Sequence, residues 1–385
     1  MNIRTRIAQS ISASAICLIG FCVAGCRNPE LAAEKKQIRI GVVLPLSGSM
    51  AEYGRNGQRG LTLAKQEIEG ESASPKIDLQ YEDTKDAPQD TVSAVHRLID
   101  VSQVKFIIGG LTSSGVLAAA PYAQQKGVLF FSPAASAPGI PQIGNLIFRN
   151  WPSDDDIAKQ YGKAAFTLGI KSTLILHVAN DYGKVNSDAF NKAFTIAGGN
   201  VILTRAFPQG TTDFKAIVSL VLNHPEAQKI FVIAYPDEYK AFFQELDHQG
   251  GTASRVMTSD TFYSPSLASD LGKKGNGILV GVAAKPKGYA PREDFIKAYG
   301  KAFTDNGKPA KPGLVSDTAY DALKLLASAI RKTDGSPSAV STWMLANTKD
   351  YRGASGPITF KDIGDVSGKL ALYVLKDGSF AEQRF

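Results

Sequence analysis

The sequence has few of the residues that most often carry redox, nucleophilic or metal chemistry. Its 385 residues include three cysteines, four histidines and two tryptophans. All the cysteines (Cys17, Cys22 and Cys26) lie near the start, so the chain beyond them has no disulfide, thiol nucleophile or cysteine-based metal site. The histidines (His96, His177, His224 and His248) show no spacing typical of metal ligands. We therefore expect no metal centre.

The common sequence motifs of enzymes are missing as well. The chain has no Gly-x-x-x-x-Gly-Lys loop, no Gly-x-Gly-x-x-Gly after a strand, no Gly-x-Ser-x-Gly and no His-Glu-x-x-His. The formal net charge is +7, but Lys and Arg are scattered among Asp and Glu rather than gathered into a stripe with aromatic residues. These absences predict a protein that is not an enzyme, needs no cofactor and has no nucleic-acid partner.

One long uncharged run lies at the start of the chain. Arg4 and Arg6 precede it, and it ends in the small residues Ala24 and Gly25 before Cys26. A basic start, an apolar run and small residues at a cleavage point are typical of a secretory signal. Small residues directly before a cysteine resemble the bacterial lipobox. We predict a signal peptide over 1–25, a lipid on Cys26 and a polar tether over 26–36, which would anchor the protein to a membrane in the periplasm or at the cell surface.

An uncleaved membrane helix is the alternative for this segment, because an uncharged run of this length could just span a bilayer. The small residues before Cys26 and the polar stretch directly after it favour the lipoprotein signal.

Strand and helix patterns alternate along the rest of the chain. Short apolar runs predict strands near 38–45, 77–81, 105–109, 128–131, 172–178, 200–204, 229–233 and 255–258. Helical spacing predicts helices between them, and also near 291–304, 316–332 and 338–347, followed by short strands near 357–360 and 370–375. Apolar strands that alternate with amphipathic helices imply parallel sheets covered on both faces. The break at Trp151-Pro152 divides the pattern into two α/β lobes.

Two junctions between a strand and a helix carry the residues best suited to bind a ligand. They are Gly109–Gly115 and Ser132–Pro138, both rich in serine and small residues. In a doubly wound sheet such junctions lie at the carboxyl ends of the strands, where ligands bind. Free backbone N–H groups at a helix start, beside hydroxyl groups, suit a carboxylate. Taken alone, both junctions could equally be helix caps, because serine is a preferred N-cap residue.

The order of several segments resembles that of a known family. They are Ile38–Gly48 with Tyr53-Gly54 and Gly60 after it, Ile107–Ser114, Phe131–Pro138, Phe148-Arg149, Asn180–Gly183, Gly210–Phe214, Lys285–Gly288 and Gly356–Phe360. In this order the chain resembles the type I periplasmic solute-binding proteins of ABC transporters, branched-chain amino acid and amide class. The resemblance covers nearly the whole chain after the predicted signal.

The resemblance implies a fold and a mode of action. The fold would be two doubly wound Rossmann-like lobes joined by a three-strand hinge, with crossovers near Pro152, Lys287 and Gly356. Lobe I would comprise 37–152 plus 287–355, and lobe II 153–286 plus 356–385. The protein, a monomer, would close on an amino acid, with a branched-chain or aliphatic one favoured, and deliver it to the permease subunits of an ABC transporter.

The resemblance also implies residue roles in lobe I. Ser113 would hold the ligand carboxylate, and the segment Ala134, Ala135 and Ser136 would grip the same carboxylate and contact the ammonium group. Tyr53, Leu111 and Thr112 would form the wall near the ligand side chain.

In lobe II, Tyr182 and Tyr235 would close over the ligand, and Asp260 would pair with its ammonium group. A helix cap is the alternative for Asp260. The register at Tyr235 could instead place Tyr239 at the ligand. Apolar packing is favoured for Met257, Phe262 and Trp151.

Two other functions stay open at this point. The same fold could bind an amide, urea or a short organic or aromatic acid, although an acid without an amine would leave Asp260 unpaired. The protein could also be the ligand-sensing part of a receptor.

Overall fold

The computed structural model describes residues 37–71, 75–85 and 87–385. The predicted signal peptide, Cys26 and the tether lie outside the described residues. Within the described ranges, no helix is both long and apolar enough to cross a membrane. Both sheets described below belong to one compact unit of the chain.

The first sheet has five parallel strands in the order β2-β1-β3-β4-β5. Their bounds are β1 (Gln37–Leu44), β2 (Lys76–Asp83), β3 (Phe106–Gly109), β4 (Leu129–Ser132) and β5 (Ile147–Arg149). Every residue of β3, β4 and β5 is buried, as expected for short apolar strands covered on both faces. We call the part of the chain built on this sheet lobe I.

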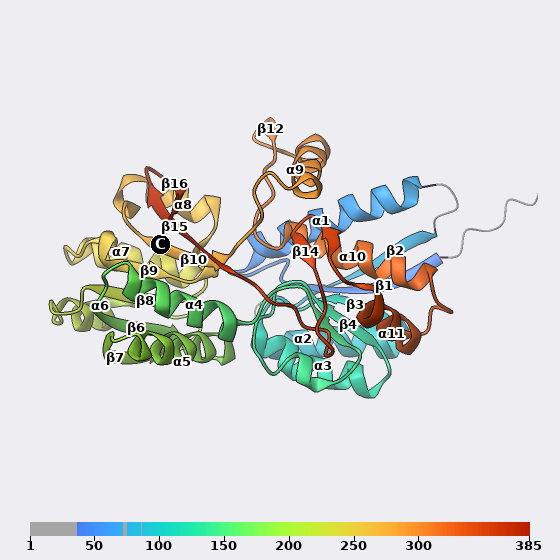
Figure 1. Ribbon diagram of the computed structural model, residues 1–385, viewed down its shortest axis with the longest axis horizontal. Helices are drawn as coiled ribbons and strands as arrows, with labels where there is room; N and C mark the ends of the chain where they lie inside the picture. The colour runs from blue at the N-terminus through green and yellow to red at the C-terminus, as the bar shows by residue number, and fades with distance from the viewer. Residues whose placement is uncertain (1–36, 72–74, 86) are drawn as a thin grey trace, which may run out of the picture. The chain divides into compact units, whose positions relative to one another are not determined.

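Helices cover both faces of the first sheet (Figure 1). They are α1 (Ala51–Gly70), α2 (Pro88–His96) with a π-helical turn at Arg97–Val101, α3 (Ser113–Gln125), α10 (Ser316–Arg331) and α11 (Pro337–Asn347). A further helix, α9 (Ala290–Ala302), packs on α1 and not on the sheet. Alternate side chains of β1 enter different clusters. Val42 packs with residues of α1 and α10, while Val43 packs with those of α2 and α3. A Cβ atom at Gly60 would lie 2.0 Å from the Ser316 carbonyl oxygen, so glycine lets α1 and α10 pack closely.

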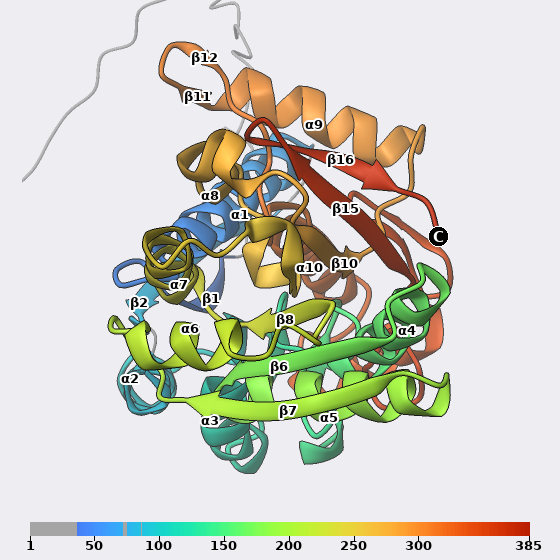
Figure 2. The same cartoon turned by 90° about the vertical axis from the view of Figure 1, so that its left-hand side faces the viewer.

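The second sheet has seven strands in the order β16-β15-β10-β9-β8-β6-β7 (Figure 2). They are β6 (Ser172–Val178), β7 (Asn200–Phe207), β8 (Lys229–Ile233), β9 (Val256–Thr258), β10 (Leu279–Ala283), β15 (Leu370–Lys376) and β16 (Ser379–Gln383). The strands from β10 to β7 are parallel, while β15 and β16 add to the β10 edge as antiparallel strands. Its helices are α4 (Asp154–Thr167), α5 (Asp181–Ile196), α6 (Lys215–Leu222), α7 (Pro236–His248) and α8 (Pro265–Leu271). This part is lobe II.

Three segments connect the lobes, and one of them lies elsewhere than predicted. The first two follow β5 and β10, close to Pro152 and Lys287. The predicted third crossover at Gly356 is wrong, because the hairpin of β13 (Tyr351–Gly353) and β14 (Gly356–Ile358) stays with lobe I. There the Asp321 side chain of α10 accepts hydrogen bonds from the backbone N–H groups of Ala354 and Ser355, at 2.7 and 2.8 Å.

The chain beyond the hairpin also remains on lobe I. Phe360 packs against Phe131 and Phe148, with ring centroids 5.9 and 5.2 Å away. Asp365 pairs with the buried Arg149 at 2.6 Å. The chain therefore crosses to lobe II between Asp365 and Leu370, and the boundary predicted at residue 356 is too early. A further small hairpin, β11 (Thr304–Asp305) with β12 (Lys308–Pro309), follows α9.

Candidate functional site

A small cavity of about 30 Å³ lies where the two lobes meet. Its lining residues are Met50, Tyr53, Leu111, Thr112, Ser113, Ala134 and Ser136 from the first part of lobe I, Trp151 from the hinge, Tyr182, Tyr235, Asp260 and Thr261 from lobe II, and Leu314 and Val315 from the segment before α10. This space is enough for only a few water molecules. The structure is therefore that of a protein whose lobes are closed on each other.

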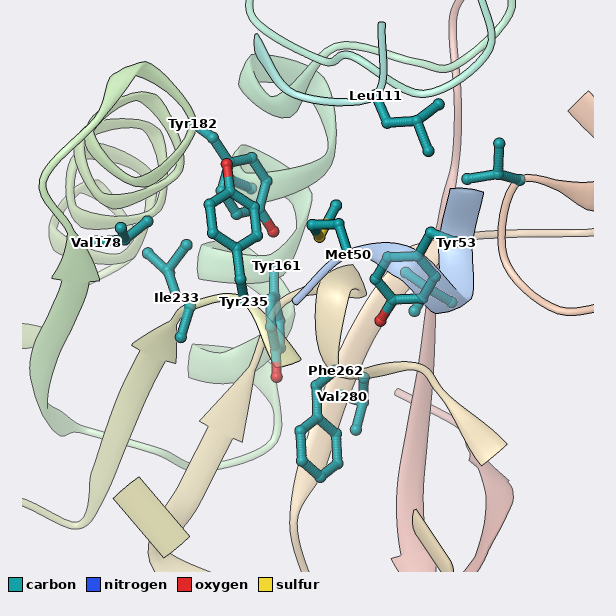
Figure 3. Packing of buried hydrophobic residues seen from close by; sticks show 14 of the residues in the cluster. Met50, Tyr53, Leu111, Tyr161, Val178, Tyr182, Ile233, Tyr235, Phe262 and Val280 are labelled. Carbon is teal, nitrogen blue, oxygen red and sulfur yellow. The ribbon is translucent and has the colours of Figure 1, made fainter. Parts of the chain in front are cut away.

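Direct hydrogen bonds between the lobes hold this closed arrangement. The Tyr53 hydroxyl donates to the Thr261 carbonyl at 2.6 Å. The Glu52 carboxylate, in the first turn of α1, accepts from the hydroxyls of Ser264 and Ser266. Figure 3 shows Met50 and Tyr53 from lobe I beside Tyr182 and Tyr235 from lobe II.

Nine of the ten residues predicted to bind a ligand line this cavity. The exception is Ala135, whose side chain is 1% exposed and packs in the cluster of β3, α2 and α3. Ala134 and Ser136, on either side of it, do line the cavity. Ala135 thus supports the site from the core and does not form its surface.

Ser113, the first residue of α3, is arranged to donate a hydrogen bond. Its hydroxyl oxygen accepts from the backbone N–H groups of Ser136 and Ala137, at 3.4 and 3.1 Å. A serine hydroxyl has two acceptor lone pairs and one proton, so the proton is left for another partner. A free hydroxyl proton at a helix N-terminus favours an anion.

Ser136 has the opposite arrangement. Its hydroxyl donates to Oδ2 of Asp154 at 2.5 Å, which is the arrangement that an ionised Asp154 requires, because a carboxylate can only accept. With its proton engaged, the Ser136 hydroxyl can act toward the cavity only as a hydrogen-bond acceptor, through its lone pairs. The two serines of the site therefore have different hydrogen-bonding roles toward a ligand: Ser113 can donate, whereas Ser136 can accept.

Asp260 brings a carboxylate to the cavity from lobe II. It follows β9 and begins the short 3₁₀ turn Asp260–Phe262. Its Oδ1 accepts from the Tyr182 hydroxyl at 2.7 Å and from the Thr261 N–H at 2.9 Å. The ring of Tyr182 stacks on that of Tyr235, with centroids 5.6 Å apart. Asp260 thus lines the cavity, and its carboxylate also accepts a hydrogen bond from the backbone of the turn that it begins.

Tyr235, not Tyr239, lies at the cavity. Tyr239 is fully buried in lobe II, where its hydroxyl donates to the Val232 carbonyl at 3.1 Å. Met257 and Phe262 are also fully buried and do not line the cavity, as predicted for packing residues. Trp151, for which packing was also favoured, does line it.

Two buried carboxyl groups give the site an acidic character. Burial and the nearby charge of Asp260 together raise the pKa of Asp154 to about 7, against hydrogen bonds from Ser136 and Asn186. Burial likewise raises the pKa of Asp260, although hydrogen bonds from Tyr182 and Trp151 oppose the shift. A cation placed between them would relieve the cost of burying both charges.

Sequence reasoning missed several residues at or beside the cavity. Asp154 is the most notable of them, since it is 4% exposed at the first position of α4. Its only signal is the run of three aspartates after Ser153, the helix N-cap. The remaining ones are Met50, Thr261, Leu314 and Val315. Val315 has a φ of 76°, which is rare for a β-branched residue, so a strained backbone lies at the cavity wall.

Within the part of the chain that the structure describes, no group of three or more His, Cys, Asp or Glu side chains could hold a metal ion. Hydroxyl, carboxylate and aromatic groups line the cavity beside its apolar side chains.

The family follows from the sequence itself, since residues 37–379 match the sequence model of the periplasmic binding proteins. The chain belongs to the periplasmic binding protein family. The Leu/Ile/Val-binding protein of Escherichia coli K12 is 26% identical to this periplasmic binding protein over 362 residues, which is 91% of this chain and 93% of the relative.

Solved structures agree with the predicted fold of two α/β lobes. A leucine-binding protein from Thermotoga maritima has a TM-score of 0.81 and 25% identity, over 90% of this chain and 98% of the other. A solute-binding protein of an ABC transporter from R. palustris, in complex with benzoate, has a TM-score of 0.81 and 19% identity, over 90% and 95% of the two chains. The predicted fold class is thereby confirmed.

Proposed function

We propose that this periplasmic binding protein captures an α-amino acid by hinge closure and delivers it to the permease of an ABC transporter. The proposal rests on the hydrogen-bonding roles of three side chains at the cavity. The Ser113 hydroxyl is left to donate, the Ser136 hydroxyl is left to accept, and Asp260 lines the cavity from lobe II. Ser113 offers a donor at a helix N-terminus for the ligand carboxylate. Ser136 and Asp260 offer acceptors for the ligand ammonium group.

A zwitterion fits such a site better than a plain acid does. An acid without an amine would leave the carboxyl groups of Asp260 and Asp154 buried without a cation, which is costly. An uncharged amide would supply N–H donors but no carboxylate for Ser113. The amine therefore decides between these ligand classes.

The apolar part of the cavity favours an aliphatic ligand side chain. Met50, Leu111, Leu314 and Val315 supply branched or flexible apolar surface from lobe I. The relatives named for leucine, isoleucine and valine support the same choice. We therefore propose a branched-chain or similar aliphatic amino acid as the ligand.

The lipid anchor is part of the proposal and rests on the sequence around Cys26. Mass spectrometry of the protein purified from bacterial membranes should find the mature chain starting at a lipid-modified Cys26. In a Cys26→Ser variant the protein should leave the membrane fraction. A mature chain that retains the residues before Cys26 would refute the anchor.

Calorimetric titration tests the ligand. The chain from residue 27 onward, unfolded and refolded to remove any bound solute, is titrated with the twenty amino acids, the same acids without their amino group, benzoate and short amides. We expect tight binding of one aliphatic amino acid, and its loss in Asp260→Ala. Asp270→Ala, an exposed position on the neighbouring helix α8, is the control and should bind as the wild type does.

Binding of benzoate or another plain acid, with no response to any amino acid, would refute the proposal and assign the site to organic acids. An Asp260→Ala variant with unchanged affinity for the amino acid would refute the role of Asp260 alone.

A further inference from the structure

Asp154 and Ser136 are joined by two hydrogen bonds. The Ser136 hydroxyl donates to Asp154 Oδ2 at 2.5 Å, and the Asp154 backbone N–H donates to the Ser136 carbonyl at 3.0 Å. Both residues are almost fully buried, at 4% and 2% exposed. Ser136 lines the cavity, whereas Asp154 lies behind it.

Stabilisation of helix α4 does not explain why this aspartate is buried. The first turn of α4 has three consecutive acids, Asp154, Asp155 and Asp156. Asp155 pairs with Lys159, and Asp156 lies 3.8 Å from Lys361, with both acids partly exposed. These two can interact with the helix dipole at little cost in desolvation. A third carboxyl group, buried at a cost in desolvation, requires another reason.

The consequence of the contact lies in the hydroxyl group of Ser136. That hydroxyl has a single proton and donates it in a hydrogen bond to Asp154. A ligand ammonium group nearby keeps Asp154 ionised, so Ser136 can then only accept at the cavity. Asn186 of α5 hydrogen-bonds to Asp154 in turn, and its amide also donates to the Tyr182 carbonyl at 3.2 Å. The carboxylate is therefore fixed from lobe II while it orients a hydroxyl of lobe I.

We propose that Asp154 is a positioning residue that keeps the Ser136 hydroxyl oriented as an acceptor, and that this makes the site select ligands with an amino group over the same acids without one. The inference rests on the proposed function. It adds Asp154, which does not line the cavity, to the residues that determine binding. It also gives a physical cause for the preference for acids that carry an amino group.

A double-mutant cycle tests whether Asp154 acts through Ser136. Ser136→Ala, Asp154→Ala and the double variant are titrated with the amino acid that the wild type binds, and with the same acid lacking its amino group. Each single variant should weaken binding of the amino acid by roughly 10- to 100-fold. The double variant should be no weaker than Ser136→Ala by more than about threefold, while binding of the deaminated acid stays unchanged or improves.

Two further variants separate orientation from charge and from folding. Asp154→Asn keeps an oxygen that can accept the Ser136 proton, so it should retain most of the preference for the amine. Asp155→Ala removes a neighbouring charge from the same helix turn and should behave as the wild type does. Circular dichroism and the Tm of each variant establish that it is folded before it is titrated.

Three results would overturn the inference. In the first, Asp154→Ala weakens binding by the same factor in the Ser136→Ala background as in the wild type, which would indicate a direct effect. In the second, Asp154→Ala weakens both ligands equally, or Asp154→Asn loses as much as Asp154→Ala. In the third, the wild type itself prefers the deaminated acid, which would refute the proposed function as well, so the two failures can be told apart.

Discussion

The contact between Glu52 and the serines of lobe II should control how fast a bound ligand leaves. Glu52 belongs to lobe I, and the Ser264 hydroxyl lies 3.0 and 2.9 Å from its two carboxylate oxygens. Ser266 donates to one of the same oxygens. These bonds can exist only while the lobes are closed, so Glu52→Ala should destabilise the closed form relative to the open one.

The size of the effect follows from the geometry. A hydrogen bond to a charged group contributes roughly 1.5–3 kcal/mol. Glu52 is only half-buried, and water replaces the lost partners when the lobes open, so we take about 1–2 kcal/mol for the whole contact. That corresponds to roughly a 5- to 30-fold weaker affinity. Because closure follows ligand entry, nearly all of the change should appear in the dissociation rate.

Stopped-flow fluorescence measures that rate directly, because Trp151 lines the cavity and should report its occupancy. Glu67→Ala is the matched control. Glu67 lies on the same helix but bonds Tyr320 and Lys324 within lobe I, so its loss should not change dissociation. A dissociation rate for Glu52→Ala within twofold of the wild type would refute the reasoning, as would an equal increase in both variants.

Three other perturbations have definite expected outcomes. The pKa of Asp154, raised by burial to about 7 from 3.8, means that the folded state keeps a proton that the unfolded state loses above pH 4. Stability should therefore fall as the pH rises from 4 to 7, and Asp154→Asn should raise the Tm at pH 8 while leaving it unchanged at pH 4. Leu314 and Trp151 line both the site and an adjoining cavity of about 190 Å³, so Leu314→Ala should improve binding of longer apolar amino acids by roughly tenfold in calorimetry. Arg149→Met leaves a buried carboxylate without its main partner and should lower the free energy of unfolding by about 3 kcal/mol in urea titration, whereas Lys361→Met, more exposed, should change it little.

The two-lobe fold could be predicted from the sequence because its signals are local. Runs such as Phe106–Gly109 and Leu129–Ser132 are too short for helices and wholly apolar, which is what a parallel strand covered on both faces requires. The third crossover could not be found in this way. Its position depends on Phe360 packing against two rings of lobe I and on Asp365 pairing with Arg149, contacts far apart in the sequence.

The site shows the same division between local and tertiary information. Ser113 and Ser136 each follow a short apolar run in the sequence, and these runs predict that both serines lie beyond the carboxyl end of a strand. Asp154, in contrast, looks like any acid at a helix start, and only packing determines which of three consecutive aspartates is buried. Val315 reaches the cavity from a segment some two hundred residues beyond Ser113, in a backbone conformation that no local pattern indicates.

The antiparallel edge of the second sheet has a consequence for biosynthesis. Strand β10 gains its neighbour β15 only after α9, α10 and α11 have been made, because these helices come between the two strands in the chain. Until then a fully buried strand presents open backbone groups, which invite pairing with another chain. A nascent chain interrupted between β10 and β15 would therefore be prone to aggregate, and a chaperone that shields β10 would help to prevent this.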